Sequence, residues 1–138
     1  RTEILILSGT GGFPYRPGNK GVIMFDLDNI AAEESAVNDL EEVVMGLIIN
    51  SGQARSLAYA ALKQAKQGDF AAAKAMMEQS RMALSEAHLV QTQLIESDEG
   101  EGKMKVSLVL VHAQDHLMTS MLARELVAEF IELHEKVQ

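Results

Sequence analysis

The chain has 138 residues, enough for one domain with its own core, and its composition, rich in Ala, Leu, Met and Glu but poor in aromatic residues and Pro, favours an all-helical fold. Its net charge of −8 argues against nucleic-acid binding, and the absence of Cys excludes disulfides and thiolate chemistry. No apolar run approaches the roughly 20 residues of a membrane span, so we expect a soluble cytoplasmic protein without direct membrane insertion.

Residues 1–25 differ in character from the rest of the chain, and we expect them to form a flexible extension. They carry five of the ten glycines and both prolines, which favour turns and linkers. The apolar runs 4–7 and 22–25 are able to pair as a hairpin, although two strands alone are marginally stable. The glycine-rich stretch 9–12 lacks the Gly-Lys-Ser/Thr ending of a phosphate-binding loop. We interpret the extension as an addition from cloning or from translation upstream of the usual start, and residues 26–138 as the functional domain.

The first helix is expected over residues 33–67. Apolar residues recur every three or four positions along this stretch, as the buried face of a helix requires. Small residues interrupt the pattern at Gly46, Ser51 and Gly52. Such residues either kink a helix or let another helix approach closely.

Two more helices are expected, over residues 69–95 and 103–136, which completes an antiparallel three-helix bundle. Gly68 suits the left-handed position after a helix, and Asp69 suits the cap of the next one. The connection between the second and third helices, residues 97–102, is polar and acidic. We therefore expect it to be a loop.

The third helix is apolar over more than half of its circumference. One apolar stripe runs along it, made of Leu108, Val111, Met118, Leu122 and Leu126. A second apolar flank lies beside it, made of Val109, Ala113, Leu117 and Met121. A three-helix monomer does not need so wide an apolar face, so we expect copies of the chain to assemble through this helix. Asp115 lies inside the stripe. Copies of it would meet near the symmetry axis, where a shared cation or proton would relieve their repulsion.

The same helix carries the strongest candidate for a functional site. His112, Asp115 and His116 lie three and four positions apart, so they converge on one face, and such groups are costly to bury unless they are paired or bind a metal. Imidazole is a nucleophile near neutral pH when one nitrogen is held protonated, and Asp115 or His116 is able to orient His112 in this way. A polar cluster that only sets helix register explains the same spacing equally well.

The other polar residues give weaker signals. A metal half-site would need a second motif of the Glu-x-x-His type, which the chain lacks. His88 has no convergent partner, so we expect it to be structural or solvent-facing. His134 suits the dipole at the end of the third helix, so we assign it a structural role. Gln114 points elsewhere on its own helix and is placed to reach the site of a neighbouring subunit.

Two long motifs resemble those of a known family. They are EEVVMGLIINSGQARS, residues 41–56, and VHAQDHLMT, residues 111–119. Both are similar to the enzyme IIA component of the lactose/cellobiose class of the bacterial phosphoenolpyruvate-dependent sugar phosphotransferase system. The resemblance covers about residues 25–138, diverges over 30–38, and has no counterpart for residues 1–24.

The resemblance implies that His112 accepts a phosphoryl group from the histidine phosphocarrier protein and donates it to a cysteine of the sugar-specific IIB protein. This relay would support uptake of a disaccharide, N,N′-diacetylchitobiose or a cellobiose-like sugar. The resemblance also implies a homotrimer through the third helix, three Asp115 side chains sharing Mg²⁺ or another divalent cation at its axis, and a pocket that includes Gln114 and His116. No organic cofactor is expected, because His112 itself carries the phosphate. The alternative is a non-catalytic helical adaptor that assembles as an oligomer.

Overall fold

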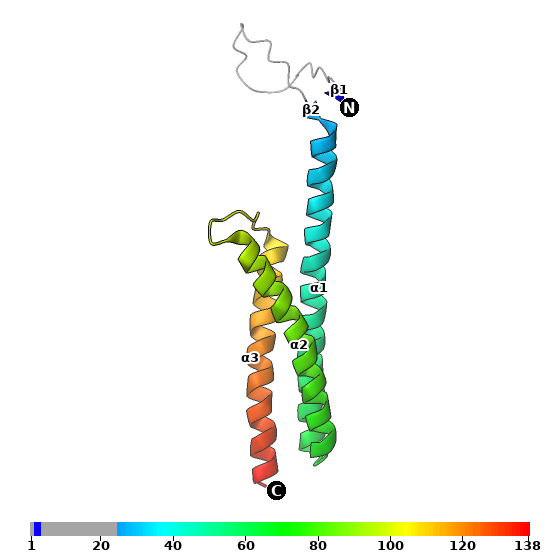
Figure 1. Ribbon diagram of the computed structural model, residues 1–138. Coiled ribbons are helices and arrows are strands. Elements are labelled where there is room, and N and C mark those ends of the chain that lie inside the picture. Colours follow the sequence, from blue (N-terminus) through cyan, green and yellow to red (C-terminus); the bar gives the residue numbers. More distant parts are fainter. Residues whose placement is uncertain (1, 4–24) are drawn as a thin grey trace, which may run out of the picture. The chain divides into compact units, whose positions relative to one another are not determined.

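A computed structural model describes the backbone of residues 2–3 and 25–138 and the side chains of residue 32 and residues 39–138. The elements are β1 (Thr2–Glu3), β2 (Phe25–Asp26), α1 (Leu27–Lys66), α2 (Phe70–Asp98) and α3 (Leu108–Lys136), as Figure 1 shows. The short strands pair antiparallel. The apolar runs 4–7 and 22–24 and the glycine-rich stretch 9–12 lie outside the described residues, so the flexible extension stays a prediction.

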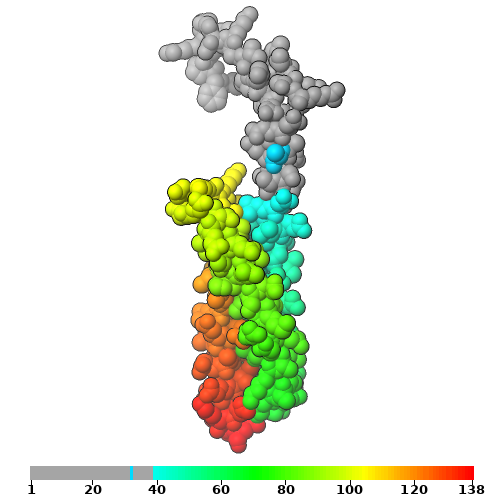
Figure 2. Space-filling view, viewed as in Figure 1, coloured from blue at the N-terminus to red at the C-terminus, as the bar shows by residue number. Residues whose placement is uncertain are grey.

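The chain divides into two compact units, residues 1–40 and 41–138, and the second contains the helical bundle. In that unit α1 and α3 run in the same direction and α2 runs against both (Figure 1). α2 and α3 pack against each other, and both are seen along one face of the bundle in Figure 2. The predicted helical fold with three helices is confirmed. None of the helices in the described part of the chain is both long and apolar enough to cross a membrane.

α1 begins six residues before its predicted start at residue 33. Residues 27–32 contain no Gly or Pro that would stop a helix, so the backbone is already helical where the apolar periodicity has not yet begun. At its other end the helix is followed by Gly68 in the left-handed conformation, with φ of 84°, as predicted. The side chain of Asp69 then accepts a hydrogen bond from the backbone N–H of Ala72 at 3.0 Å and caps α2.

The predicted start of α3 at residue 103 is wrong, because the helix begins at Leu108. Side chains capture the backbone donors that an earlier start would use. Asp98 accepts from the N–H of Gly102 at 3.2 Å and from the N–H of Met104 at 2.8 Å. Ser107 accepts from the N–H of Leu110 at 3.2 Å and is the helix cap. The end of α2 correspondingly moves from the predicted residue 95 to Asp98.

The core between the helices consists largely of small side chains. Seven alanines have no exposed surface: Ala54, Ala58, Ala61, Ala65, Ala73, Ala87 and Ala113. Each helix also contributes one fully buried serine, Ser51 from α1, Ser80 from α2 and Ser120 from α3. Small side chains at the contact bring helix axes close together.

The predicted apolar stripe of α3 is exposed in the single subunit. Its members Leu108, Val111, Met118, Leu122 and Leu126 are between 49% and 85% exposed. The bundle instead buries a different face of α3, made of Leu110, Ala113, Leu117, Ser120, Val127 and Ile131. α3 thus carries more apolar surface than one subunit covers, as its sequence predicted.

Candidate functional site

The site begins with two imidazole rings on successive turns of α3. His112 is exposed and His116 is half-buried. Their ring planes differ by only 4°, and their centroids lie 6.1 Å apart. The i, i+4 spacing produces this arrangement, because residues four apart lie above one another on a helix. An accessible imidazole with a second one beside it is the structural centre of the candidate site.

Asp115 does not orient either histidine within the subunit. Its side chain is exposed, and in the described residues its carboxylate makes no hydrogen bond or ion pair with His112 or His116. The hydrogen bond at this residue involves the backbone, where the Thr119 hydroxyl donates to the Asp115 carbonyl at 2.9 Å. The free-energy cost of burying the Asp115 carboxylate therefore arises only when a partner covers this face of α3.

Gln114 reaches toward α2, and its partner lies in the same subunit. The side-chain Nε2 of Gln91 donates to Oε1 of Gln114 and lies 3.7 Å from the sulfur of Met118. Gln91 is only 7% exposed, and sequence reasoning missed it. The signal was present, since Gln91 continues the inward spacing of Ser80, Leu84 and Ala87, so a polar residue occupies a core position.

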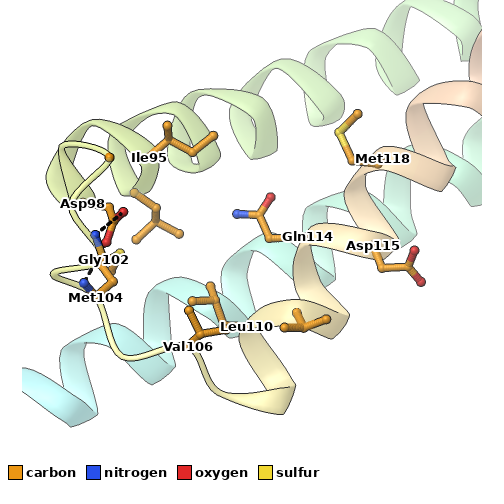
Figure 3. A pocket seen from close by; sticks show the side chains of 12 residues that line it. Ile95, Asp98, Gly102, Met104, Val106, Leu110, Gln114, Asp115 and Met118 are labelled. Carbon is orange, nitrogen blue, oxygen red and sulfur yellow. Dashed lines mark hydrogen bonds between the residues drawn. The ribbon is translucent and has the colours of Figure 1, made fainter.

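A groove of about 550 Å³ lies beside the histidines, between the end of α2, the following loop and the start of α3. Most of its lining is apolar: Leu94, Ile95, Met104, Val106, Leu110, Val111 and Met118. Figure 3 shows Gln114 directed into the groove and the Asp115 carboxylate directed away from it. His112 does not line the groove, so its exposed imidazole lies on the open surface outside it.

The described residues of one subunit do not complete a metal site. The described residues contain no group of three or more His, Asp or Glu side chains that could hold a metal ion. Asp115 offers carboxylate oxygens, which Mg²⁺ accepts as ligands, from the exposed apolar face of α3. The donor chemistry therefore fits a hard divalent cation only where other copies of the chain bring further carboxylates to it.

The remaining histidines lie away from this cluster in the sequence and differ in exposure. His88 is exposed on α2. In the described residues its ring makes no hydrogen bond, and its backbone carbonyl accepts from the Thr92 hydroxyl at 3.0 Å. His134 lies in the last turn of α3, where a cation interacts favourably with the helix dipole. Neither has the paired-ring arrangement of His112.

Comparisons with known proteins give one consistent result. The family model described as PTS system, lactose/cellobiose specific IIA subunit, matches residues 42–135. The PTS system N,N′-diacetylchitobiose-specific EIIA component of Escherichia coli (strain K12) is 83% identical over 115 residues, which are 83% of this chain and 99% of that protein. The lichenan-specific phosphotransferase enzyme IIA component of Bacillus subtilis (strain 168) is 39% identical over 72% of this chain and 90% of that protein.

Solved structures agree with the sequence matches. One match is the IIA(Chitobiose) chain in the solution structures of the IIA(Chitobiose)-HPr complex of the N,N′-diacetylchitobiose branch of the Escherichia coli phosphotransferase system. It is 90% identical with a TM-score of 0.64, and the match covers 71% of this chain and 95% of that chain. The crystal structure of the PTS cellobiose specific enzyme IIA from Bacillus anthracis is 47% identical with a TM-score of 0.67, and the match covers 70% of this chain and 89% of that chain.

Proposed function

The chain belongs to the lactose/cellobiose-specific IIA subunit family of the PTS, the phosphotransferase system, as its two motifs predicted, and we propose that it is a phosphocarrier built around His112. His112 accepts a phosphoryl group from the histidine phosphocarrier protein HPr. It then donates this group to a cysteine of the sugar-specific IIB protein. A relative that shares 90% of the matched residues forms a complex with HPr, which supports HPr as the donor.

The observation that carries this proposal is the exposed imidazole of His112 on a rigid helix. A protein donor and a protein acceptor must each bring a reacting atom to the same nitrogen, so an open position suits the task better than an enclosed pocket. α3 is a continuous helix through the site, and His116 lies parallel beside the nucleophile. The apolar groove next to His112 adds surface that a partner is able to cover.

Each transfer is a displacement at phosphorus. In the first step a ring nitrogen of His112 attacks the phosphorus of phospho-HPr, a new N–P bond forms, and the N–P bond to the donor histidine breaks. In the second step a cysteine thiolate of IIB attacks, an S–P bond forms, and the bond to His112 breaks. Positioning and stabilisation of charge on the phosphoryl oxygens dominate such reactions. We propose that an N–H of His116 stabilises that charge and that Gln114 contributes to the same pocket.

We also propose that the working unit is a homotrimer packed through α3. The exposed stripe from Leu108 to Leu126 supports an assembly that covers it. Three Asp115 side chains would then converge at the axis. Mg²⁺ or another divalent cation, or a shared proton, would offset their mutual repulsion.

The sugar branch follows from the relatives rather than from the geometry. A IIA protein hands its phosphate to IIB and does not contact the sugar, so its specificity lies in the IIB protein that it recognises. The 83% identical relative is N,N′-diacetylchitobiose-specific, whereas the cellobiose-specific relative of Lactococcus lactis is 38% identical. We therefore propose the N,N′-diacetylchitobiose branch.

The test is phosphorylation by the purified upstream proteins. The chain is incubated with phosphoenolpyruvate, enzyme I and HPr, and its intact mass is measured at neutral pH. We expect a gain of one phosphoryl group that maps to His112, is lost in acid and is stable in base. His112→Ala should abolish the gain, and His88→Ala should keep it. No gain on the wild-type chain, with both upstream proteins shown to be active, would overturn the relay and favour the helical adaptor.

A further inference from the structure

We propose that Gly52 of α1 is a positioning residue for phosphoryl transfer, and that it acts through His116. The inference rests on the proposed phosphocarrier role of His112. It concerns a residue on a different helix from the nucleophile, and it gives that helix a part in the reaction.

Gly52 leaves space that the ring of His116 uses. A Cβ atom added to Gly52 would lie 3.3 Å from Nε2 of His116, which is closer than ordinary van der Waals contact. Gly52 lies in the interior of α1 and its φ is not in the left-handed region. Glycine weakens a helix interior, and no turn or cap requires it here. The close approach of the imidazole therefore accounts for the glycine.

The contact is local to the site. Gly46 lies in the same helix, and a Cβ added to it would meet nothing within 4 Å. A neighbouring side chain therefore occupies the space beside Gly52 but not the space beside Gly46. Of the two roles predicted for small residues in this helix, a kink or a close approach, Gly52 permits a close approach, by the side chain of His116.

The contact orients the ring that stands beside the nucleophile. His116 is half-buried, and among the described residues its imidazole makes no hydrogen bond. The hydrogen bond at this residue involves its backbone carbonyl, which accepts from the Thr119 hydroxyl at 3.3 Å. Packing against α1 is therefore what holds the ring. Because the rings of His116 and His112 are parallel to within 4°, a shift of His116 changes the geometry that the nucleophile and its phosphoryl group encounter.

The chemical consequence lies in the charge on phosphorylated His112. A phosphoryl group brings negative oxygens to α3, and charge-assisted hydrogen bonds to such oxygens are strong and directional. A methyl group at position 52 would push the edge of His116 away from α1 by a few tenths of an ångström. Misplacement of about 1 Å lowers rates by roughly 100-fold, so we expect Gly52→Ala to slow transfer from phospho-HPr by about three- to ten-fold.

The experiment compares Gly52→Ala with Gly46→Ala, which makes the same chemical change in the same helix without a neighbour. Circular dichroism should show that both variants are folded. The rate of phosphoryl transfer from phospho-HPr should fall in Gly52→Ala only. The NMR signals of the His112 and His116 rings should shift in Gly52→Ala and stay in place in Gly46→Ala.

A second comparison tests whether the effect passes through His116. Gly52→Ala is introduced into a His116→Ala background, where the clashing ring is gone. We expect no further loss of rate, since two changes in one contact are not additive. A full additional loss in this background would overturn the inference.

The outcomes separate this inference from the function on which it rests. A wild-type chain that accepts no phosphate overturns both. A wild-type chain that accepts phosphate, together with equal rates in Gly52→Ala and Gly46→Ala, overturns the role of Gly52 alone.

Discussion

His112, Asp115 and His116 share one helix but have different surroundings. His112 and Asp115 are exposed in the subunit, whereas His116 is held between α3 and the backbone of α1 at Gly52. The three residues therefore do not form a hydrogen-bonded triad. The imidazole of His112 is accessible on the surface, and the ring of His116 packs against α1 at Gly52. The Asp115 carboxylate lies on the exposed stripe of α3.

Gln91 offers a test of how the pocket is supported from α2. Its side chain is buried and donates to Gln114. Gln91→Leu keeps a similar volume but removes the donor, so we expect the free energy of unfolding to fall by about 1–2 kcal/mol. Urea denaturation followed by circular dichroism measures the change. Gln93→Leu, at an exposed position of α2, should stay within about 0.5 kcal/mol of the wild type. Equal stability of both variants would show that water replaces the Gln91 donor.

At the scale of whole helices, the bundle is held by close contacts between small residues. The hydroxyl of Ser80 in α2 donates to the carbonyl of Ala54 in α1 at 2.6 Å. The hydroxyls of Ser51 and Ser120 are also buried, but they have no hydrogen-bond partner among the described residues. Buried serines thus serve two purposes here. One links two helices, and the others provide small volume.

This difference predicts opposite results for the same substitution. Ser80→Ala removes a hydrogen bond between helices and should lower the free energy of unfolding by about 1 kcal/mol. Ser120→Ala removes a buried hydroxyl without a partner and should be neutral or stabilising, because the cost of burying the polar group disappears. Thermal and urea unfolding of the two variants measure the difference. A loss in Ser120→Ala as large as in Ser80→Ala would show that its hydroxyl is bonded after all.

At the scale of the whole molecule, α3 divides its apolar residues between two faces. One face packs in the bundle, and the other, which carries Asp115, stays exposed in the single subunit. An exposed apolar stripe along the length of a helix is typical of an interface with a protein partner. Assembly through α3 is the proposal that accounts for it.

Asp115→Leu tests what happens where the copies meet. If no cation bridges the carboxylates, replacing them removes repulsion and desolvation cost and should strengthen the trimer by roughly 1–4 kcal/mol for each group replaced. Sedimentation equilibrium in the presence of a metal chelator measures the association. Leu122→Asp adds a charge to the same stripe and should weaken assembly. Weaker assembly of Asp115→Leu, together with loss of wild-type trimers in chelator, would instead indicate a cation clamp.

By itself the sequence determined three helices, the wide apolar face of α3, the family and the candidate nucleophile. These properties are encoded by patterns among residues that are close together along the chain. The patterns are the apolar periodicity, a glycine at a helix end and two contiguous motifs. The predicted start of the third helix at residue 103 was wrong, because the Asp98 side chain accepts hydrogen bonds from the backbone of the loop and Ser107 caps the helix at Leu108.

Only the tertiary structure decided which residues of different helices face one another. It paired Gln91 with Gln114 and set His116 against Gly52, and it left the Asp115 carboxylate without a histidine partner in the subunit. Spacing within one helix predicts which side chains share a face, but it carries no information on what the opposite helix presents there. That depends on how the helices pack, and in this bundle the small residues of the core set how closely they approach.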